Sequence, residues 1–138
     1  MIKLIGNRYQ IDEKYFVSRL SELSRILDLK GDISIKLGSS QESQALNLEY
    51  LQKDYPTDVL SFPLQQQLPE GFYLGDIFIC FPLAQEQALK FDIPPNNELL
   101  RLMIHGILHL TGYDHEQDAG EMEKLQERLL SDLLNLKP

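Results

Sequence analysis

The sequence has one cysteine and no apolar stretch long enough to cross a membrane. The single thiol, Cys80, excludes an internal disulfide and is typical of a reducing compartment. Its neighbours, "DIFICF", read as a buried strand, so we expect an inert core thiol. The longest near-apolar run, "LLRLMIHGILHL", is too short for a bilayer, and the N-terminal residues "MIKLIGNRYQ" show no secretory signal. These absences predict a cytoplasmic protein with no membrane segment.

Positive charge is also scarce. There are 13 Lys and Arg against 21 Asp and Glu, which gives a formal net charge of −8. Phosphate binding needs a positive footprint, so a broad nucleic-acid-binding surface is disfavoured, whereas a local basic groove is not. Much of the excess lies in one segment: residues 114–132 hold seven acids against Lys124 and Arg128.

Apolar periodicity predicts a single α+β domain spanning residues 1–138. Strands are expected over residues 2–9, 33–37, 59–63 and 72–81, and the segment "LQQQLPEG" (64–71) reads as a loop. Helices are expected near residues 12–31, 39–51, 83–91, 98–111 and 118–134. About four strands and four or five helices in irregular order are typical of an α+β domain. Expected helix boundaries are Asp12 and Gly31 for the first helix, Asn96 or Asn97 and Gly112 for the fourth.

All three histidines fall within one short stretch, "HGILHLTGYDH". His105 and His109 are four residues apart on the buried helix, about 40° apart around its axis and roughly 6 Å apart along it. Gly112 lets the chain reverse, so that His115 can return as a third ligand. Three imidazoles suit zinc and, less specifically, nickel or copper, and they leave one position for a catalytic water. The alternative is a pair of core histidines hydrogen-bonded to backbone.

The spacing also resembles the metzincin protease pattern HExxHxxGxxH, which makes this a zincin-like metal helix. Its glutamate is missing, because Gly106 occupies that position. In those proteases the glutamate is the general base that takes a proton from zinc-bound water. A peptidase is therefore disfavoured, and the protein base is left unknown.

Three segments together resemble the YbeY family, bacterial metal-dependent endoribonucleases of ribosomal RNA maturation: the histidine stretch, "LNLEYLQKDYPTDVLSFP" (46–63) and "LGDIFIC" (74–80). They span about residues 33–128. The resemblance implies an α+β fold with a small mixed four-stranded sheet packed against four to five helices. It also implies one zinc ion held by His105, His109 and His115, and a cytoplasmic RNA substrate linked to the small ribosomal subunit.

The central motif departs from the family at one point. Where the family usually has "YRGKD", this chain has Leu51 and Gln52 in place of arginine and glycine. That arginine would be a natural bidentate phosphate clamp, which leucine cannot replace. Lys53 is the nearest substitute, with a solvated loop lysine as the alternative. Ser61 and Lys36 are further substrate-binding candidates, with a packing role equally open for Ser61.

Three aspartates are candidates for supporting the metal site. Asp58 could accept the second N–H of a histidine, or it could cap the turn after Pro56. Asp76 is a carboxylate within an apolar strand, which predicts a buried hydrogen-bonded role, structural or next to a ligand. Asp114, between two ligands, could fix the loop or touch substrate.

For a ribonuclease, a metal-bound water or hydroxide is the expected nucleophile or base, and the RNA's own 2′-hydroxyl is the other nucleophile to consider. A 2′,3′-cyclic phosphate product would indicate internal attack, and a 5′-phosphate would indicate water. The acidic surface predicts a docking partner, a ribosomal or assembly protein. Two rival functions stay open: a non-catalytic ribosome-assembly factor with a structural zinc, and a metalloprotease-like hydrolase.

Overall fold

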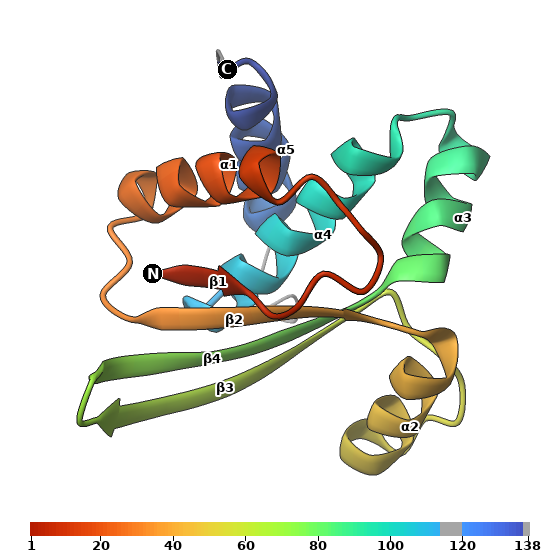
Figure 1. Cartoon of the computed structure of the whole chain (residues 1–138), viewed down its shortest axis with the longest axis horizontal. Coiled ribbons are helices and arrows are strands. Elements are labelled where there is room, and N and C mark those ends of the chain that lie inside the picture. Colours follow the sequence, from red (N-terminus) through yellow and green to blue (C-terminus); the bar gives the residue numbers. More distant parts are fainter. Residues whose placement is uncertain (114–119, 137–138) are drawn as a thin grey trace.

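A mixed four-stranded sheet forms the middle layer of the chain (Figure 1). The computed structural model describes residues 1–113 and 120–136. Its strands are β1 (Ile2–Leu4), β2 (Asp32–Gly38), β3 (Val59–Leu68) and β4 (Gly71–Cys80), in the spatial order β1-β2-β4-β3. The pairs β1–β2 and β2–β4 are parallel, and β3 is antiparallel to β4.

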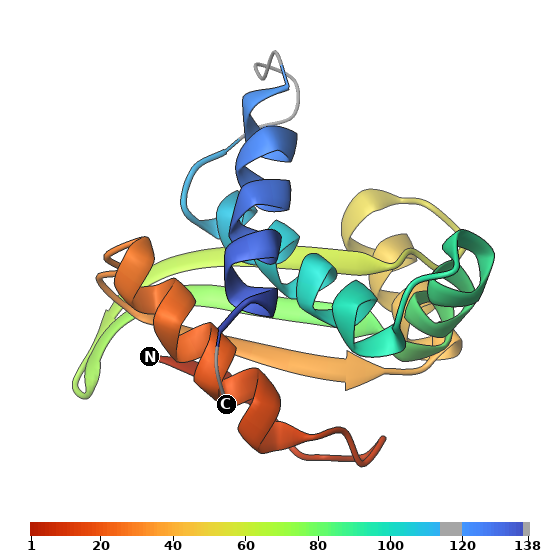
Figure 2. The ribbon, with the colours of Figure 1, turned by 90° about the horizontal axis from the view of Figure 1, so that it is seen from above.

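The described helices lie on both faces of this sheet. They are α1 (Glu13–Ile26), α2 (Ser40–Leu51), α3 (Phe81–Phe91), α4 (Pro95–Leu110) and α5 (Glu121–Leu134). Figure 1 shows α1, α4 and α5 above the sheet and α2 below it, and Figure 2 shows α5 crossing α4. The expected α+β class with a small mixed sheet is confirmed.

Helix α4 is the centre of the core. It packs against β3, β4, α3 and α5, and its apolar residues cover most of its circumference. The fully buried ones are Leu99, Leu100, Leu102, Met103, Ile104, Ile107, Leu108 and Leu110. Each such side chain stabilises the fold by about 1.5–3 kcal/mol relative to exposure. Because its apolar residues are packed against four other elements, α4 is a firm support for the polar residues that it carries.

Local sequence explains most element boundaries. Asp12 caps α1, as expected, because its carboxylate accepts the Tyr15 N–H at 3.2 Å. Ser39 and Glu42 form a reciprocal capping box at the start of α2. Gly112 has φ +105° after α4 ends, the left-handed conformation predicted for it. Cys80 is fully buried, as predicted.

Several boundary predictions are wrong. The first strand ends at Leu4 rather than at residue 9, and α3 begins at Phe81 rather than near residue 83. Residues 64–68 are part of β3 and not a loop, because β4 pairs with them across a bulge after Pro63 and supplies their backbone hydrogen bonds. Helix α4 begins at Pro95 rather than near residue 98, since proline at the first helical position has φ already fixed and no N–H to satisfy. Helix α1 ends at Ile26, before Gly31, where Asp28 takes a left-handed conformation (φ +51°).

Within the part of the chain that the structure describes, no helix combines the length and apolarity needed to cross a bilayer.

Candidate functional site

Helix α4 brings two histidine rings together at its C-terminal end. The Nε2 atoms of His105 and His109 lie 3.1 Å apart, with ring centroids 4.6 Å apart. Two ligands placed about 2.05 Å from a tetrahedral zinc ion would be about 3.3 Å apart. The observed spacing therefore fits two nitrogens converging on one ion, as the four-residue separation in the sequence predicts.

The second ring nitrogen of His105 has its own partner on α5. Its Nδ1 lies 2.8 Å from Oε1 of Gln126, a side chain only 4% exposed. An amide oxygen accepts hydrogen bonds only, so the hydrogen of this contact belongs to Nδ1 and Nε2 carries the lone pair. The donor set is thus suited to a metal ion at Nε2. Sequence reasoning did not identify Gln126.

Two of the predicted site residues, Asp114 and His115, lie outside the described residues. Within residues 1–113 and 120–136, no three His, Cys, Asp or Glu side chains gather as metal ligands. The third ligand of the predicted site falls outside the described residues, and His115 stays the prediction for it.

His109 opens onto a cleft of about 460 Å³. Its walls come from β3, the end of α4 and the turn between α1 and β2, and they include Pro63, Gln65, Leu110 and Lys30. The Lys30 ammonium is exposed and lies 3.0 Å from the Asp28 carboxylate. Lys30 is the cation among the residues that line this cleft, and no local sequence pattern connected it with the histidines.

Ser61 faces the histidine helix. Its hydroxyl donates to the carbonyl oxygen of Gly106, between the two histidines, at 3.2 Å. The side chain thus points from β3 toward α4, which agrees with the packing role that the sequence left open. In this structure the hydroxyl joins the sheet to the helix.

Gly106 explains why the protease-type glutamate is absent. A Cβ atom at this position would lie 2.9 Å from Ile77 Cγ2, and the next nearest atoms also belong to Ile77. Ile77 is 1% exposed in the middle of β4. Position 106 therefore faces the packed sheet and not the cleft, so a glutamate there would point into the core, where no water could reach it.

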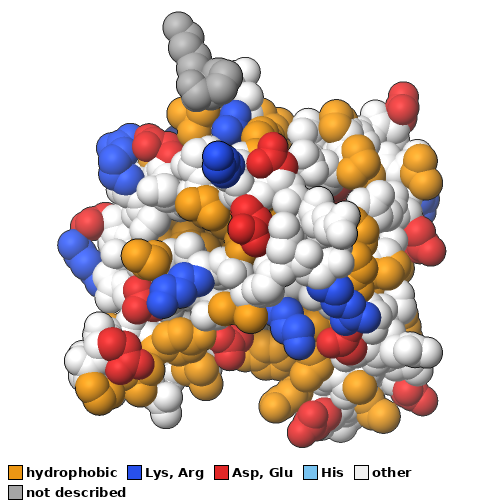
Figure 3. Space-filling view, in the orientation of Figure 1, with side chains coloured by type: hydrophobic (Ala, Val, Ile, Leu, Met, Phe, Trp, Pro, Cys, Tyr) orange, Lys and Arg blue, Asp and Glu red, His pale blue; other side chains and the backbone are white. Residues whose placement is uncertain are grey.

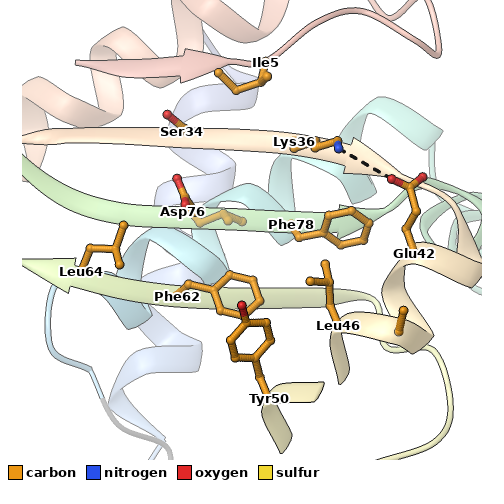
Figure 4. A pocket seen from close by; sticks show the side chains of 12 residues that line it. Ile5, Ser34, Lys36, Glu42, Leu46, Tyr50, Phe62, Leu64, Asp76 and Phe78 are labelled. Atoms are coloured by element: carbon orange, nitrogen blue, oxygen red, sulfur yellow. Dashed lines mark ion pairs between the residues drawn. The ribbon is translucent and has the colours of Figure 1, made fainter. Parts of the chain in front are cut away.

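The structure does not bring Lys36 and Asp76 to the histidines. Both line a separate hollow of about 670 Å³ between the sheet and α2 (Figure 4). The reason is the two-residue alternation of strands: Ile35 and Ile77 face α4 and the core, so their neighbours Lys36 and Asp76 face the other way. Asp76 therefore does not contact the histidines, and Lys36 lies away from the cleft beside His109.

Each of these two residues has its own partners in that hollow. The Lys36 ammonium lies 3.6 Å from Glu42 Oε2. Asp76 accepts a hydrogen bond from the Tyr73 hydroxyl, which also lies 2.8 Å from Ser34 Oγ. Burial and then the hydrogen bond with Asp76 raise the pKa of Tyr73 above its ordinary value. The hydrogen bond of Asp76 is therefore made within the sheet, which agrees with the structural alternative.

Asp58 has the contacts of a turn cap. Its Oδ1 accepts the Val59 N–H at 2.8 Å and its Oδ2 accepts the Gln87 amide at 3.2 Å. The Thr57 hydroxyl also donates to Oδ1, at 3.5 Å. These contacts agree with the capping alternative. Lys53 is exposed just after α2, where its backbone N–H donates to the Asn47 carbonyl.

The departure from the arginine motif lies at the end of α2. Leu51 is 50% exposed, so its side chain is not held in the core. Gln52 adopts a left-handed conformation with φ +58°. Glycine reaches this conformation without the Cβ penalty, which accounts for a glycine in the pattern that this segment resembles.

A partly buried ion pair precedes the histidines on the same side of α4. Glu98, 1% exposed, accepts two hydrogen bonds from Arg101, at 2.6 and 2.7 Å. The Glu98 carboxylate raises the pKa of Arg101. Arg101 is four residues before His105, so the pair extends the polar stripe of α4 by one turn.

Charge on the face seen in Figure 3 is mixed. Lys, Arg, Asp and Glu side chains are interspersed there, with hydrophobic side chains along the hollow below the sheet. This face therefore has no broad positive footprint, in agreement with the net charge of −8.

Comparison with known proteins gives one consistent family. The family model described as "Endoribonuclease YbeY" matches residues 7–134. A protein of Persephonella marina with that name is 37% identical over 137 residues, covering 95% of this chain and 89% of its own length. One of Acinetobacter baumannii, also named Endoribonuclease YbeY, is 43% identical over 110 residues, covering 74% and 70%. A solution structure from Thermotoga maritima is similar at a TM-score of 0.68 with 32% identity, covering 96% of this chain and 89% of that one.

Proposed function

The chain belongs to the YbeY family, and from that premise we propose that it is a cytoplasmic, zinc-dependent endoribonuclease that cleaves single-stranded ribosomal RNA of the small subunit during its maturation. The observation that carries the proposal is the pair of Nε2 atoms, 3.1 Å apart, beside an open cleft. The relatives that share most of this chain's length are named as endoribonucleases.

In this proposal His105, His109 and His115 hold one divalent ion. When bound, such an ion supplies Lewis-acid activation of water and of a phosphoryl group. The protein holds the two described histidines on a helix whose apolar residues are buried in the core, and Gln126 contacts the His105 ring, so the rings are oriented before the ion arrives. Helix α4 thereby fixes where on the cleft wall the reaction takes place.

Cationic side chains near the cleft would bind the RNA phosphates. Lys30 lines the cleft beside His109, and Lys53 remains the proposed substitute for the family arginine. Each neutralised phosphate releases counterions, so the contribution of each lysine shows in the salt dependence of binding. Because the chain carries a net charge of −8, a ribosomal or assembly protein is expected to supply part of the affinity.

The test measures cleavage and binding of a labelled single-stranded RNA from the small-subunit precursor, with an unfolded protein substrate alongside. We expect the RNA to be cleaved in a zinc-dependent reaction and the unfolded protein to stay intact. Lys30→Ala should weaken RNA binding several-fold and reduce the salt slope by about one. The matched control is Lys36→Ala, which removes the same charge from the opposite face of the sheet and should change binding little. Equal losses from both variants would contradict the cleft assignment.

Leu51 favours one rival, a non-catalytic assembly factor with a structural zinc, because the phosphate-clamping arginine is missing. The Leu51 side chain is half exposed, so arginine can be introduced at this position without disturbing the core. Leu51→Arg should raise the cleavage rate if the chain is a nuclease, with Leu48→Arg, exposed one turn earlier on α2, as the control for added charge. If the parent and the Leu51→Arg variant both bind zinc and neither cleaves the RNA, the result favours the assembly factor.

A further inference from the structure

Gln126 is a buried polar residue between two helices. It comes from the middle of α5, is 4% exposed, and faces α4. A buried amide needs hydrogen-bonding partners, and apolar side chains such as Met122, Leu129 and Leu133 occupy the other buried positions of α5. Its described contact is the His105 ring, at 2.8 Å.

We propose that Gln126 is a positioning residue that sets the tautomer of His105 for metal binding. This rests on the proposed metal site. The amide oxygen accepts the Nδ1 hydrogen, so Nε2 of His105 must present a lone pair toward His109. Gln126 thereby fixes the orientation of the His105 ring and the ring nitrogen that can bind the metal. It does so from α5, whereas both described histidines lie on α4.

The same contact determines the tautomer of His109 in the metal-free protein. Since Nε2 of His105 is an acceptor, the 3.1 Å contact between the two Nε2 atoms requires the hydrogen on Nε2 of His109. The two rings are therefore opposite tautomers before the ion binds. Binding through both Nε2 atoms leaves His105 unchanged and moves the hydrogen of His109 to Nδ1.

A neutral amide suits this place for an electrostatic reason. A carboxylate as deeply buried as Gln126 would carry a desolvation cost unless the histidine or an ion compensated its charge. The amide gives the hydrogen-bond direction without that charge. A glutamate at this position would keep the positioning role, because its carboxylate oxygen also accepts the Nδ1 hydrogen. It would in addition make the His105 ring a more basic ligand.

The experiment has two readouts that need no RNA. Nitrogen-15 NMR of the metal-free parent should show hydrogen on Nδ1 of His105 and on Nε2 of His109, and zinc should change the pattern of His109 only. Zinc affinity is measured by competition with a chromophoric chelator. Gln126→Met, which keeps the size and removes the acceptor, should weaken zinc binding about 10- to 100-fold, and Gln126→Glu should bind at least as tightly as the parent.

The matched control is Leu129→Met, which places the same side chain in the same buried face of α5 and should leave zinc affinity within about twofold. The proposal is overturned if Nε2 of His105 carries the hydrogen in the metal-free parent, or if Gln126→Met binds zinc like the parent. An equal loss in both methionine variants overturns it too, because helix packing would then be the cause. Should the Gln126→Met chain not fold, the parent spectrum alone decides. A parent that binds no zinc contradicts the proposed function instead.

Discussion

A single added methyl group at Gly106 tests how closely the histidine helix approaches the sheet. Alanine would place its Cβ 2.9 Å from Ile77 Cγ2, and Ile77 cannot move easily because it is 1% exposed. Such overpacking costs about 1–3 kcal/mol. Alanine also gains about 1 kcal/mol over glycine within a helix. We therefore expect Gly106→Ala to lower the free energy of unfolding by about 1 kcal/mol.

The sign of this effect should reverse when Ile77 is truncated. The three atoms nearest to the added Cβ all belong to the Ile77 side chain, and Ile77→Ala removes all three. That variant alone should lose about 2–5 kcal/mol. In its background Gly106→Ala meets no crowding and fills part of the cavity, so it should stabilise by about 1 kcal/mol, the helix gain.

Urea unfolding of the parent, the two single variants and the double variant gives the coupling energy. We expect about 2 kcal/mol, the difference between the two backgrounds. Additive effects, within about 0.5 kcal/mol, would mean that position 106 does not face Ile77. The explanation for the missing glutamate would then be refuted.

Two further predictions concern charged groups at helix ends. The Ser39 backbone N–H first, and then Arg8, lower the pKa of Glu42 from 4.5 to about 2. A lowered carboxyl pKa stabilises the fold above pH 4.5, and this contribution is lost as the pH falls toward 2. The full shift corresponds to about 3 kcal/mol, but solvent screening at a side chain 35% exposed reduces our expectation to about 1 kcal/mol. Thermal melts should show Glu42→Gln less stable than the parent at pH 7 and equal to it near pH 2; an equal deficit at both would contradict the assignment. Glu98→Gln leaves Arg101 without its carboxylate and should cost about 2–3 kcal/mol in urea unfolding. The double variant Glu98→Gln/Arg101→Met should recover part of that loss, and no recovery would argue against the ion pair.

Local patterns in the sequence were sufficient where the interaction is also local. The four-residue spacing of His105 and His109 predicts their convergence, and Asp12 predicts the start of α1, because partners within one helical turn are defined by the sequence. The face on which Asp76 lies could have been predicted, since its neighbour Ile77 is apolar and strand side chains alternate. A pattern of that kind places Asp76 on the face away from the core.

Other parts of the site depend on contacts between distant segments. Gln126 meets His105 across the α4–α5 packing, and Lys30 reaches the cleft from the turn before β2. Neither position has a local signal, because each becomes relevant only through tertiary packing. The three glutamines at 65–67 interrupt the hydrophobic alternation, and the strand conformation of residues 64–68 comes from pairing with β4.

The most direct test of the central claim is the stoichiometry of zinc binding. Equilibrium dialysis followed by elemental analysis should give one zinc ion per chain for the parent and none for the triple variant His105→Ala/His109→Ala/His115→Ala. A triple variant that still retains one equivalent of zinc would contradict the account, because the ion would then be held elsewhere.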